Sequence, residues 1–193
     1  MALLALCSDT GWEIVYGFIF PEASRHFGSG VRVWLLLHVP VVYVMLKFGA
    51  DEWDHNPLVK KNLPLVYVAL TFGFGAAQMA LANEIGPDLG FFFGGVFCQT
   101  LLIFSHLCQL LSRGSTRGAS YSIWFFRCVG FIAGFSKLIL LDLHGHNEVP
   151  WLGSPICWFY MAASVVLDII YPVCLYFMRR EEQSGEQRKN KVD

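Results

Sequence analysis

The chain has 193 residues, of which 55% are hydrophobic and only 15% charged, and its net charge at pH 7 is −1. Soluble domains carry roughly 25% charged residues, so this composition excludes an ordinary soluble domain and indicates an integral membrane protein. Nucleic-acid-binding proteins present basic surfaces, so the nearly neutral charge also excludes nucleic acid as a partner.

Six apolar stretches are long enough to cross a bilayer, which requires about 20 predominantly apolar residues. They cover residues 2–20, 31–49, 64–84, 89–111, 121–141 and 154–178. Proline marks positions where a helix begins, ends or bends; Pro21, Pro64, Pro87 and Pro150 lie at predicted boundaries, and Pro40 and Pro172 inside spans. The sequence therefore predicts an all-α, integral membrane helical bundle with about six transmembrane helices.

Glycines and alanines in the third and fourth spans predict close helix packing, because small residues let membrane helices approach each other. They are Gly73, Gly75, Ala76, Ala77, Gly90, Gly94 and Gly95. The first span contains Asp9 and Glu13 and has no basic region before it, so we expect it to be retained rather than cleaved as a signal peptide.

Basic residues gather at the second and fourth connections and after the sixth span, at Lys47, Lys60, Lys61, Arg113, Arg117, Arg179, Arg180, Arg188, Lys189 and Lys191. The positive-inside rule then predicts that both termini lie in the cytosol, with Arg25 and Arg32 in the first connection as exceptions. Residues 1–178 are predicted to form the transmembrane domain. Residues 179–193 are polar and lack a hydrophobic period, which predicts a disordered cytosolic tail.

Two acidic residues, Glu13 and Asp168, lie at similar depth inside the first and the last span. An ionisable residue inside a membrane is costly and by default marks function. Burial favours the neutral form of a carboxyl group, and a neutral buried acid can act as a general acid. The alternative is a structural role, in which each acid is hydrogen-bonded to another helix or forms half of an ion pair.

Helical spacing adds three supporting candidates. Tyr16 follows Glu13 by three residues and Tyr171 follows Asp168 by three, so each acid shares a helix face with a phenol. Asp9 precedes Glu13 by four residues on the same face. It is either a supporting acid or a solvated residue near the cytosolic end.

Other polar residues inside the predicted spans include His38, His106, Arg127 and Lys137. We interpret the two histidines as hydrogen-bonded within the bundle, and the two cations as either neutralising acids or extending to the interface. Two histidines and a carboxylate at metal-site spacing do not occur, and neither does the aspartate-rich motif of magnesium-dependent prenyl diphosphate ionisation. The nearest acidic run is residues 51–55, and we expect no metal.

Aromatic residues are frequent along several spans. Most of them fit lipid contact and an interfacial belt. Aromatic faces also stabilise cations, so buried acids beside aromatic rings would suit a reaction that passes through carbocations.

Several segments together resemble one family. They are Trp12–Tyr16, Asp51–Val59, Asn62–Pro64, Glu84–Pro87 and Ser115–Tyr121, followed by Asp168 with Tyr171. In this order, from about residue 7 to about residue 180, the chain resembles the small fungal membrane-bound terpene cyclases of meroterpenoid and indole-diterpene pathways, of the pyripyropene and paxilline type.

The resemblance implies an enzyme that protonates the epoxide of an epoxidised farnesyl or geranylgeranyl chain attached to an aromatic polyketide or an indole, without a metal or cofactor. The two acids implicated in the family match Glu13 and Asp168, and we favour Glu13 as the proton donor. The expected partners are this epoxyprenylated substrate and the lipid bilayer of the endoplasmic reticulum. The sequence identifies no protein partner.

The family usually has seven spans, with one more helix before the glutamate, whereas this chain begins twelve residues before Glu13. It represents either a shorter branch or a truncated start. Two other functions stay open: a proton-coupled small membrane transporter and a non-catalytic helical scaffold. A transporter often has related halves, and here only the short echo of E-x-x-Y and D-x-x-Y recurs.

Overall fold

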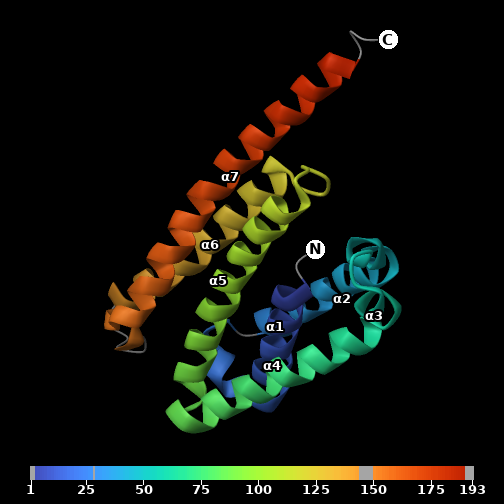
Figure 1. Ribbon diagram of the computed structural model, residues 1–193. Coiled ribbons are helices and arrows are strands. Elements are labelled where there is room, and N and C mark those ends of the chain that lie inside the picture. Colours follow the sequence, from blue (N-terminus) through green and yellow to red (C-terminus); the bar gives the residue numbers. More distant parts are fainter. Residues whose placement is uncertain (1–2, 28, 144–149, 190–193) are drawn as a thin grey trace. The chain divides into compact units, whose positions relative to one another are not determined.

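The computed structural model describes residues 3–27, 29–143 and 150–189, which are almost entirely helical and contain no β-strand (Figure 1). Seven α-helices are present in these residues: α1 (Leu3–Ile14), α2 (Gly30–Phe48), α3 (Pro57–Lys61), α4 (Leu63–Ile85), α5 (Pro87–Arg113), α6 (Tyr121–Leu143) and α7 (Pro155–Lys189). A π-helical turn, Val15–Ile19, continues α1, and 3-10 turns cover Pro21–Phe27, Gly49–Trp53 and Pro150–Gly153. The predicted all-α membrane fold is confirmed.

The prolines act as the sequence predicts. Pro64 lies in the first turn of α4, Pro87 begins α5, and Pro40 and Pro172 lie inside α2 and α7. Gly86 separates α4 from α5 with a φ of 91°, a backbone conformation that glycine adopts without steric cost.

Five helices of the described chain, rather than six, are long and apolar enough to cross a membrane: Gly30–Trp53, Leu63–Ile85, Pro87–Arg113, Tyr121–Leu140 and Pro155–Gly185. The missing one is the predicted first span, residues 2–20, of which α1 forms only 12 residues. At 1.5 Å per residue α1 is roughly 18 Å long, whereas the hydrocarbon layer is about 30 Å thick. Most of α1 is buried by other helices, including its polar residues Ser8, Thr10 and Glu13.

The end of the chain also differs from the prediction. Residues 179–189, predicted as a disordered tail, continue α7 as a helix to Lys189, and 190–193 lie outside the described residues (Figure 1). The tail is rich in Glu, Gln, Arg and Lys, which are good helix formers. Because α7 already exists before this segment, each added residue extends a helix without the cost of nucleating one.

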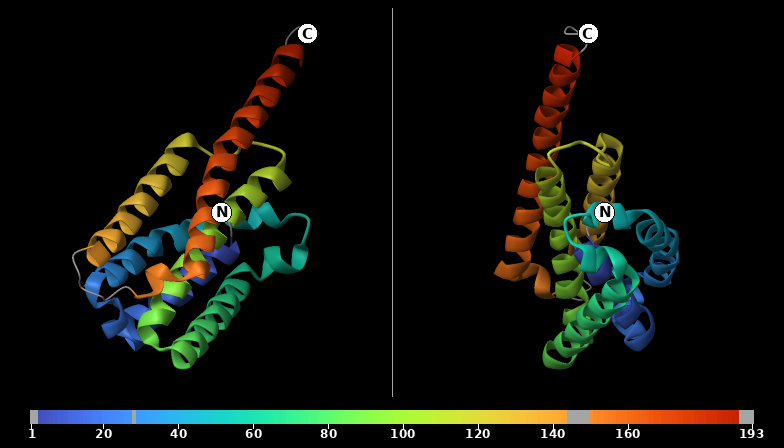
Figure 2. Two further views of the ribbon diagram at one scale, coloured as in Figure 1. Left: turned by 90° about the vertical axis from the view of Figure 1, so that its left-hand side faces the viewer. Right: turned by 45° about the vertical axis from the view of Figure 1, so that its right-hand side comes forward.

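The chain forms two compact units, Met1–Leu102 and Ile103–Asp193. In the N-terminal unit α1 packs along α4 and against α2 (Figure 2). The buried core there consists of Leu3, Leu6, Cys7, Met45, Leu63 and Tyr67. A Cβ at Gly11 of α1 would lie 2.8 Å from the backbone nitrogen of Gly75, so α1 and α4 meet almost backbone to backbone.

The beginning of α5 approaches its neighbours equally closely. A Cβ at Gly90 would lie 2.9 Å from the Cα of Ala82, and one at Gly94 would lie 2.9 Å from Cδ1 of Trp12. The close packing predicted from small residues is therefore confirmed at these positions. It is wrong for Gly73, where an added Cβ would meet nothing within 4 Å.

In the C-terminal unit α6 and α7 pack together, and Leu107 and Leu110 of α5 share a buried core with Tyr171 and Leu175 of α7. The connection between α5 and α6 is attached to the far end of α7. Glu182 accepts hydrogen bonds from the backbone nitrogen of Thr116 at 2.7 Å and from its hydroxyl at 2.6 Å. The segment predicted as a tail thus holds a loop of the fold in place.

We expect Gly90→Ala to destabilise the protein by about 1–3 kcal/mol, the usual cost of overpacking, because the new methyl group would meet the backbone of α4. Thermal unfolding in detergent measures the effect. Gly73→Ala is the matched control and should leave the unfolding temperature unchanged or raise it slightly. An equal loss in both variants would contradict the close approach at Gly90.

Candidate functional site

Glu13 is one of the most deeply buried polar residues of the N-terminal unit, with 1% of its surface exposed. It comes from the last turn of α1, and its Oε2 lies 3.0 Å from Nδ1 of His38 on α2. A buried carboxyl group needs a hydrogen-bonding partner, and here an imidazole supplies it. The interpretation of His38 as hydrogen-bonded within the bundle is confirmed, and its partner is the predicted catalytic acid.

The backbone changes its winding directly after Glu13. Val15–Ile19 forms a π-helical turn, in which the nitrogen of Phe20 donates to the carbonyl of Val15 at 2.8 Å. Single π-helical turns occur frequently at functional sites. Nε of Arg32 on α2 donates to the carbonyl of Gly17 in this turn at 2.9 Å. Two polar contacts from α2, made by His38 and Arg32, therefore fix the segment that carries Glu13. Arg32 is one of the two arginines that are exceptions to the positive-inside pattern.

Asp9 lies one turn before Glu13 and is half-buried. It interacts electrostatically with both Glu13 and His38, and it is hydrogen-bonded to the thiol of Cys98. The hydroxyl of Ser8 lies 3.1 Å from the same thiol. Asp9 thus belongs to the polar group around Glu13, and its role as a supporting acid stays a prediction.

Tyr16 is fully buried, and its hydroxyl donates to the carbonyl of Gln78 on α4 at 3.4 Å. Its ring packs edge-on against Phe91, with the centroids 5.5 Å apart, and lies 5.8 Å from the ring of Trp12. Nε1 of Trp12 donates to the carbonyl of Phe91 at 2.9 Å. Aromatic rings therefore cover the side of α1 that faces α5.

Asp168 of α7 forms a buried ion pair with Arg127 of α6 in the C-terminal unit. The side chains are 10% and 8% exposed, respectively. The prediction that Arg127 neutralises an acid or extends to the interface is thereby decided in favour of the first alternative. Nε1 of Trp124 also donates to the backbone carbonyl of Asp168 at 2.8 Å.

Two further residues hold the guanidinium group of Arg127. Its Cζ lies 5.1 Å from the centre of the Tyr171 ring, which is a cation–π contact. Its NH1 lies 3.2 Å from Nδ1 of His106, so this histidine is hydrogen-bonded within the bundle, as predicted. Tyr171 therefore contacts the cation that pairs with Asp168.

Glu13 and Asp168 belong to different units, so their joint action stays a prediction. The sequence alone does not pair His38 with Glu13 or Arg127 with Asp168. One signal existed for the second pair: Asp168 is the single acid of residues 154–178, and Arg127 lies well inside the preceding span. A charge inside a membrane requires an opposite charge nearby.

Residues 51–55 form the acidic run that is most similar to a metal-binding motif, and a lysine forms ion pairs with two of its aspartates. Nζ of Lys60 lies 2.6 Å from Asp54 and 3.5 Å from Asp51, and its hydrogen bond lowers the pKa of Asp54. Among the described residues, no group of three or more His, Cys, Asp or Glu side chains is arranged to hold a metal ion.

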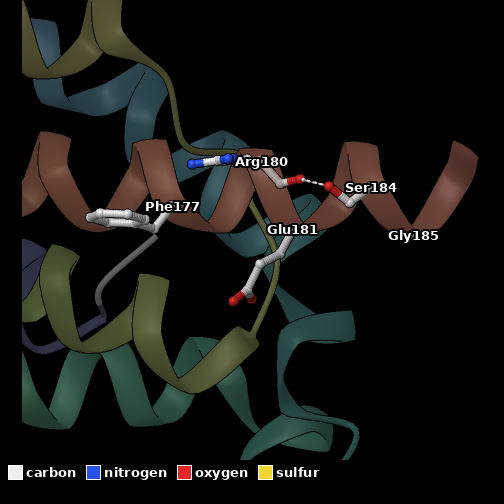
Figure 3. A pocket seen from close by; sticks show the side chains of 5 residues that line it. All are labelled: Phe177, Arg180, Glu181, Ser184 and Gly185. Carbon is white, nitrogen blue, oxygen red and sulfur yellow. Dashed lines mark hydrogen bonds between the residues drawn. The ribbon is translucent and has the colours of Figure 1, made fainter.

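A surface hollow of about 440 Å³ lies along the polar end of α7 and contains none of the predicted site residues (Figure 3). It is lined by Phe177, Arg180, Glu181, Ser184 and Gly185. These positions repeat at three and four residues and so form one face of a single helix. The hydroxyl of Ser184 is bonded to the carbonyl of Arg180 at 2.8 Å. This hollow does not explain the buried acids.

Comparison with known proteins gives a consistent result. The family described as Pyr4-like transmembrane terpene cyclases matches residues 1–181. The terpene cyclase adrI of Penicillium rubens is 45% identical over 190 residues, which cover 97% of this chain and 76% of the relative. The terpene cyclase atmB of Aspergillus flavus is 41% identical over 183 residues, covering 95% and 75%, respectively.

A third relative, the terpene cyclase trt1 of Aspergillus terreus, is 37% identical over 193 residues, covering 100% of this chain and 80% of its own length. No solved structure matches the chain.

We expect Arg127→Met to reduce the yield of folded protein, because it leaves Asp168 buried without its cation. Breaking a buried pair from one side costs about 3–5 kcal/mol, whereas replacing both partners by apolar residues is often neutral. The double variant Arg127→Met/Asp168→Leu should therefore recover stability, measured as unfolding temperature in detergent. Arg117→Met, at an exposed position, is the control. A double variant no more stable than the single one would contradict the pairing.

Proposed function

Since the chain belongs to the Pyr4-like transmembrane terpene cyclases, we propose that it cyclises an epoxidised farnesyl or geranylgeranyl chain attached to an aromatic polyketide or an indole. The reaction begins when Glu13 protonates the epoxide. The observation that carries this proposal is the buried carboxyl group of Glu13, which is hydrogen-bonded to an imidazole rather than to a permanent cation.

The proposed chemistry is an isomerisation in which atoms balance. The O–H bond of Glu13 breaks as a new O–H bond forms on the epoxide oxygen, and one epoxide C–O bond breaks with its electron pair passing to oxygen. The carbocation that results is attacked by the neighbouring alkenes in turn, which forms the rings. A proton lost from the final cation equals the one supplied at the start, so Glu13 is restored.

The partners of the two acids favour different roles for them. A guanidinium group remains charged at any ordinary pH, so Asp168 is paired with a permanent cation, whereas a proton donor has to hold its proton before the reaction. Imidazole is neutral or charged near neutral pH, so His38 is compatible with a protonated Glu13. We therefore assign proton donation to Glu13.

Asp168 serves in this proposal as the supporting partner. A fixed carboxylate in a water-poor environment stabilises positive charge that develops in a transition state. Three residues support the two acids. Asp9 is near Glu13, and Tyr16 attaches the turn after Glu13 to α4. Tyr171 contacts Arg127, the partner of Asp168.

The relatives bear the name terpene cyclase, and the multi-pass membrane character of this chain follows from the five long apolar helices of its described residues and from its family. We further propose that it resides in the endoplasmic reticulum membrane with both termini in the cytosol. The basic residues of the second and fourth connections support this orientation.

We expect Glu13→Gln to lower the rate of cyclisation by about 10²- to 10⁴-fold, the usual contribution of a general acid, because glutamine cannot donate the proton. Microsomes that contain the full chain are supplied with an epoxyprenylated aromatic substrate, and the cyclised product is quantified. Glu22→Gln, at an exposed position, is the matched control. Retained activity in Glu13→Gln at a normal protein level would refute the assignment.

We expect Asp168→Asn and the stabilised double variant Arg127→Met/Asp168→Leu both to lose cyclisation, because each removes the carboxylate. The double variant separates chemistry from folding, since its apolar pair does not leave a buried charge. Asp142→Asn, an exposed change on α6, serves as the control. A folded and active double variant would show that Asp168 only joins helices, as the structural alternative for this acid states.

A further inference from the structure

His38 contacts the proton donor from a different helix. Its Nδ1 lies 3.0 Å from Oε2 of Glu13, within ordinary hydrogen-bond distance. The Glu13 side chain is 2% exposed and that of His38 is 17% exposed. Since the imidazole reaches Oε2, the other carboxyl oxygen, Oε1, is the one that can carry the proton for the substrate.

We propose that His38 is a positioning residue for Glu13, and this inference rests on the proposed function. Its Nδ1–H donates to Oε2, holds the carboxyl group in one orientation, and stabilises the carboxylate that remains after proton transfer. A hydrogen bond from a neutral donor strengthens when its acceptor becomes charged. The bond is therefore stronger in the transition state than before it, which is the condition for accelerating the chemical step.

In this step His38 neither gains nor loses a proton. The O–H bond at Oε1 breaks, the epoxide oxygen gains the proton, and the negative charge spreads over both carboxyl oxygens of Glu13. His38 keeps its Nδ1 proton throughout. When Glu13 regains a proton at the end of the cycle, the hydrogen bond returns to its weaker, neutral form.

The surroundings of His38 favour this role over simple packing. Among the described residues, the acidic side chains that interact with its ring are Glu13 and Asp9, both on α1. The same α2 helix also donates from Arg32 to Gly17 in the π-helical turn. Helix α2 thus makes one polar contact with the end of α1 and one with the π-helical turn that follows it, and the contact made by His38 is with the reacting group, Glu13.

The test compares variants that differ in the donor alone. In His38→Asn the side-chain amide places an N–H close to the position of Nδ1, but it does not titrate. In His38→Phe the ring shape is kept and the donor is lost, and in His38→Leu both are removed. His55→Leu is the matched control, because His55 lies in an exposed loop.

Cyclisation in microsomes should fall by about 10- to 150-fold in kcat for His38→Phe and His38→Leu, the equivalent of one hydrogen bond to a charged group. KM should change little, because the substrate is not touched. His38→Asn should retain activity within about tenfold of wild type. Full activity in a folded His38→Phe or His38→Leu variant would overturn the proposal.

Two further outcomes keep the test decisive. If His38→Asn is folded but as inactive as His38→Phe, and loses one limb of the pH–rate profile, His38 carries a proton and the fixed-donor role is wrong. If neither donor-free variant folds, the comparison of His38→Asn with wild type decides in the same way. Failure of the proposed function itself is distinguishable, because Glu13→Gln would then remain active whatever the His38 variants do.

Discussion

An acidic group that leaves water needs a partner, and two buried acids of the described residues each have one on a neighbouring helix. Glu13 of α1 meets His38 of α2, and Asp168 of α7 meets Arg127 of α6. An unpaired ionised group in hydrocarbon costs several kcal/mol or more, so these contacts decide which helices can stand together. The two partners differ in kind, because a guanidinium group is permanently charged whereas an imidazole is neutral or charged near neutral pH. We propose the first acid as the proton donor and the second as its supporting partner.

The position of Glu13 depends on glycines, which have no side chain, as much as on the side chains that contact it. Gly11 lets α1 approach α4 closely, and Gly90 and Gly94 let α5 approach Ala82 and Trp12. Dispersion between tightly packed helices replaces the hydrophobic effect, which contributes little between helices in lipid. The result is a short helix surrounded by longer ones, with its acid shielded from both lipid and water.

Hydropathy predicts the helical class, and the prolines predict most helix boundaries, because both are local properties of the chain. The burial of the short helix α1 is not predicted in this way. Its polar residues Ser8 and Thr10 form hydrogen bonds inside the N-terminal unit, and a hydropathy profile contains no information on such contacts. The contact of His38 with Glu13 joins residues 25 positions apart, and a single sequence contains no distance information. The helix at residues 179–189 was not predicted, because composition describes a segment in isolation. Here the segment extends an existing helix, so its helical form does not require the unfavourable free energy of nucleation.

Helix α7 has 35 residues, so it is roughly 52 Å long at 1.5 Å per residue, well beyond the thickness of about 30 Å of a hydrocarbon layer. Its excess length is not an appendage. Glu182, on that excess, receives both hydrogen bonds from Thr116, so a chain cut at the hydrophobic boundary near residue 178 would lose the anchor of the loop before α6. The folded part of this protein therefore extends further along the chain than its hydrophobic part.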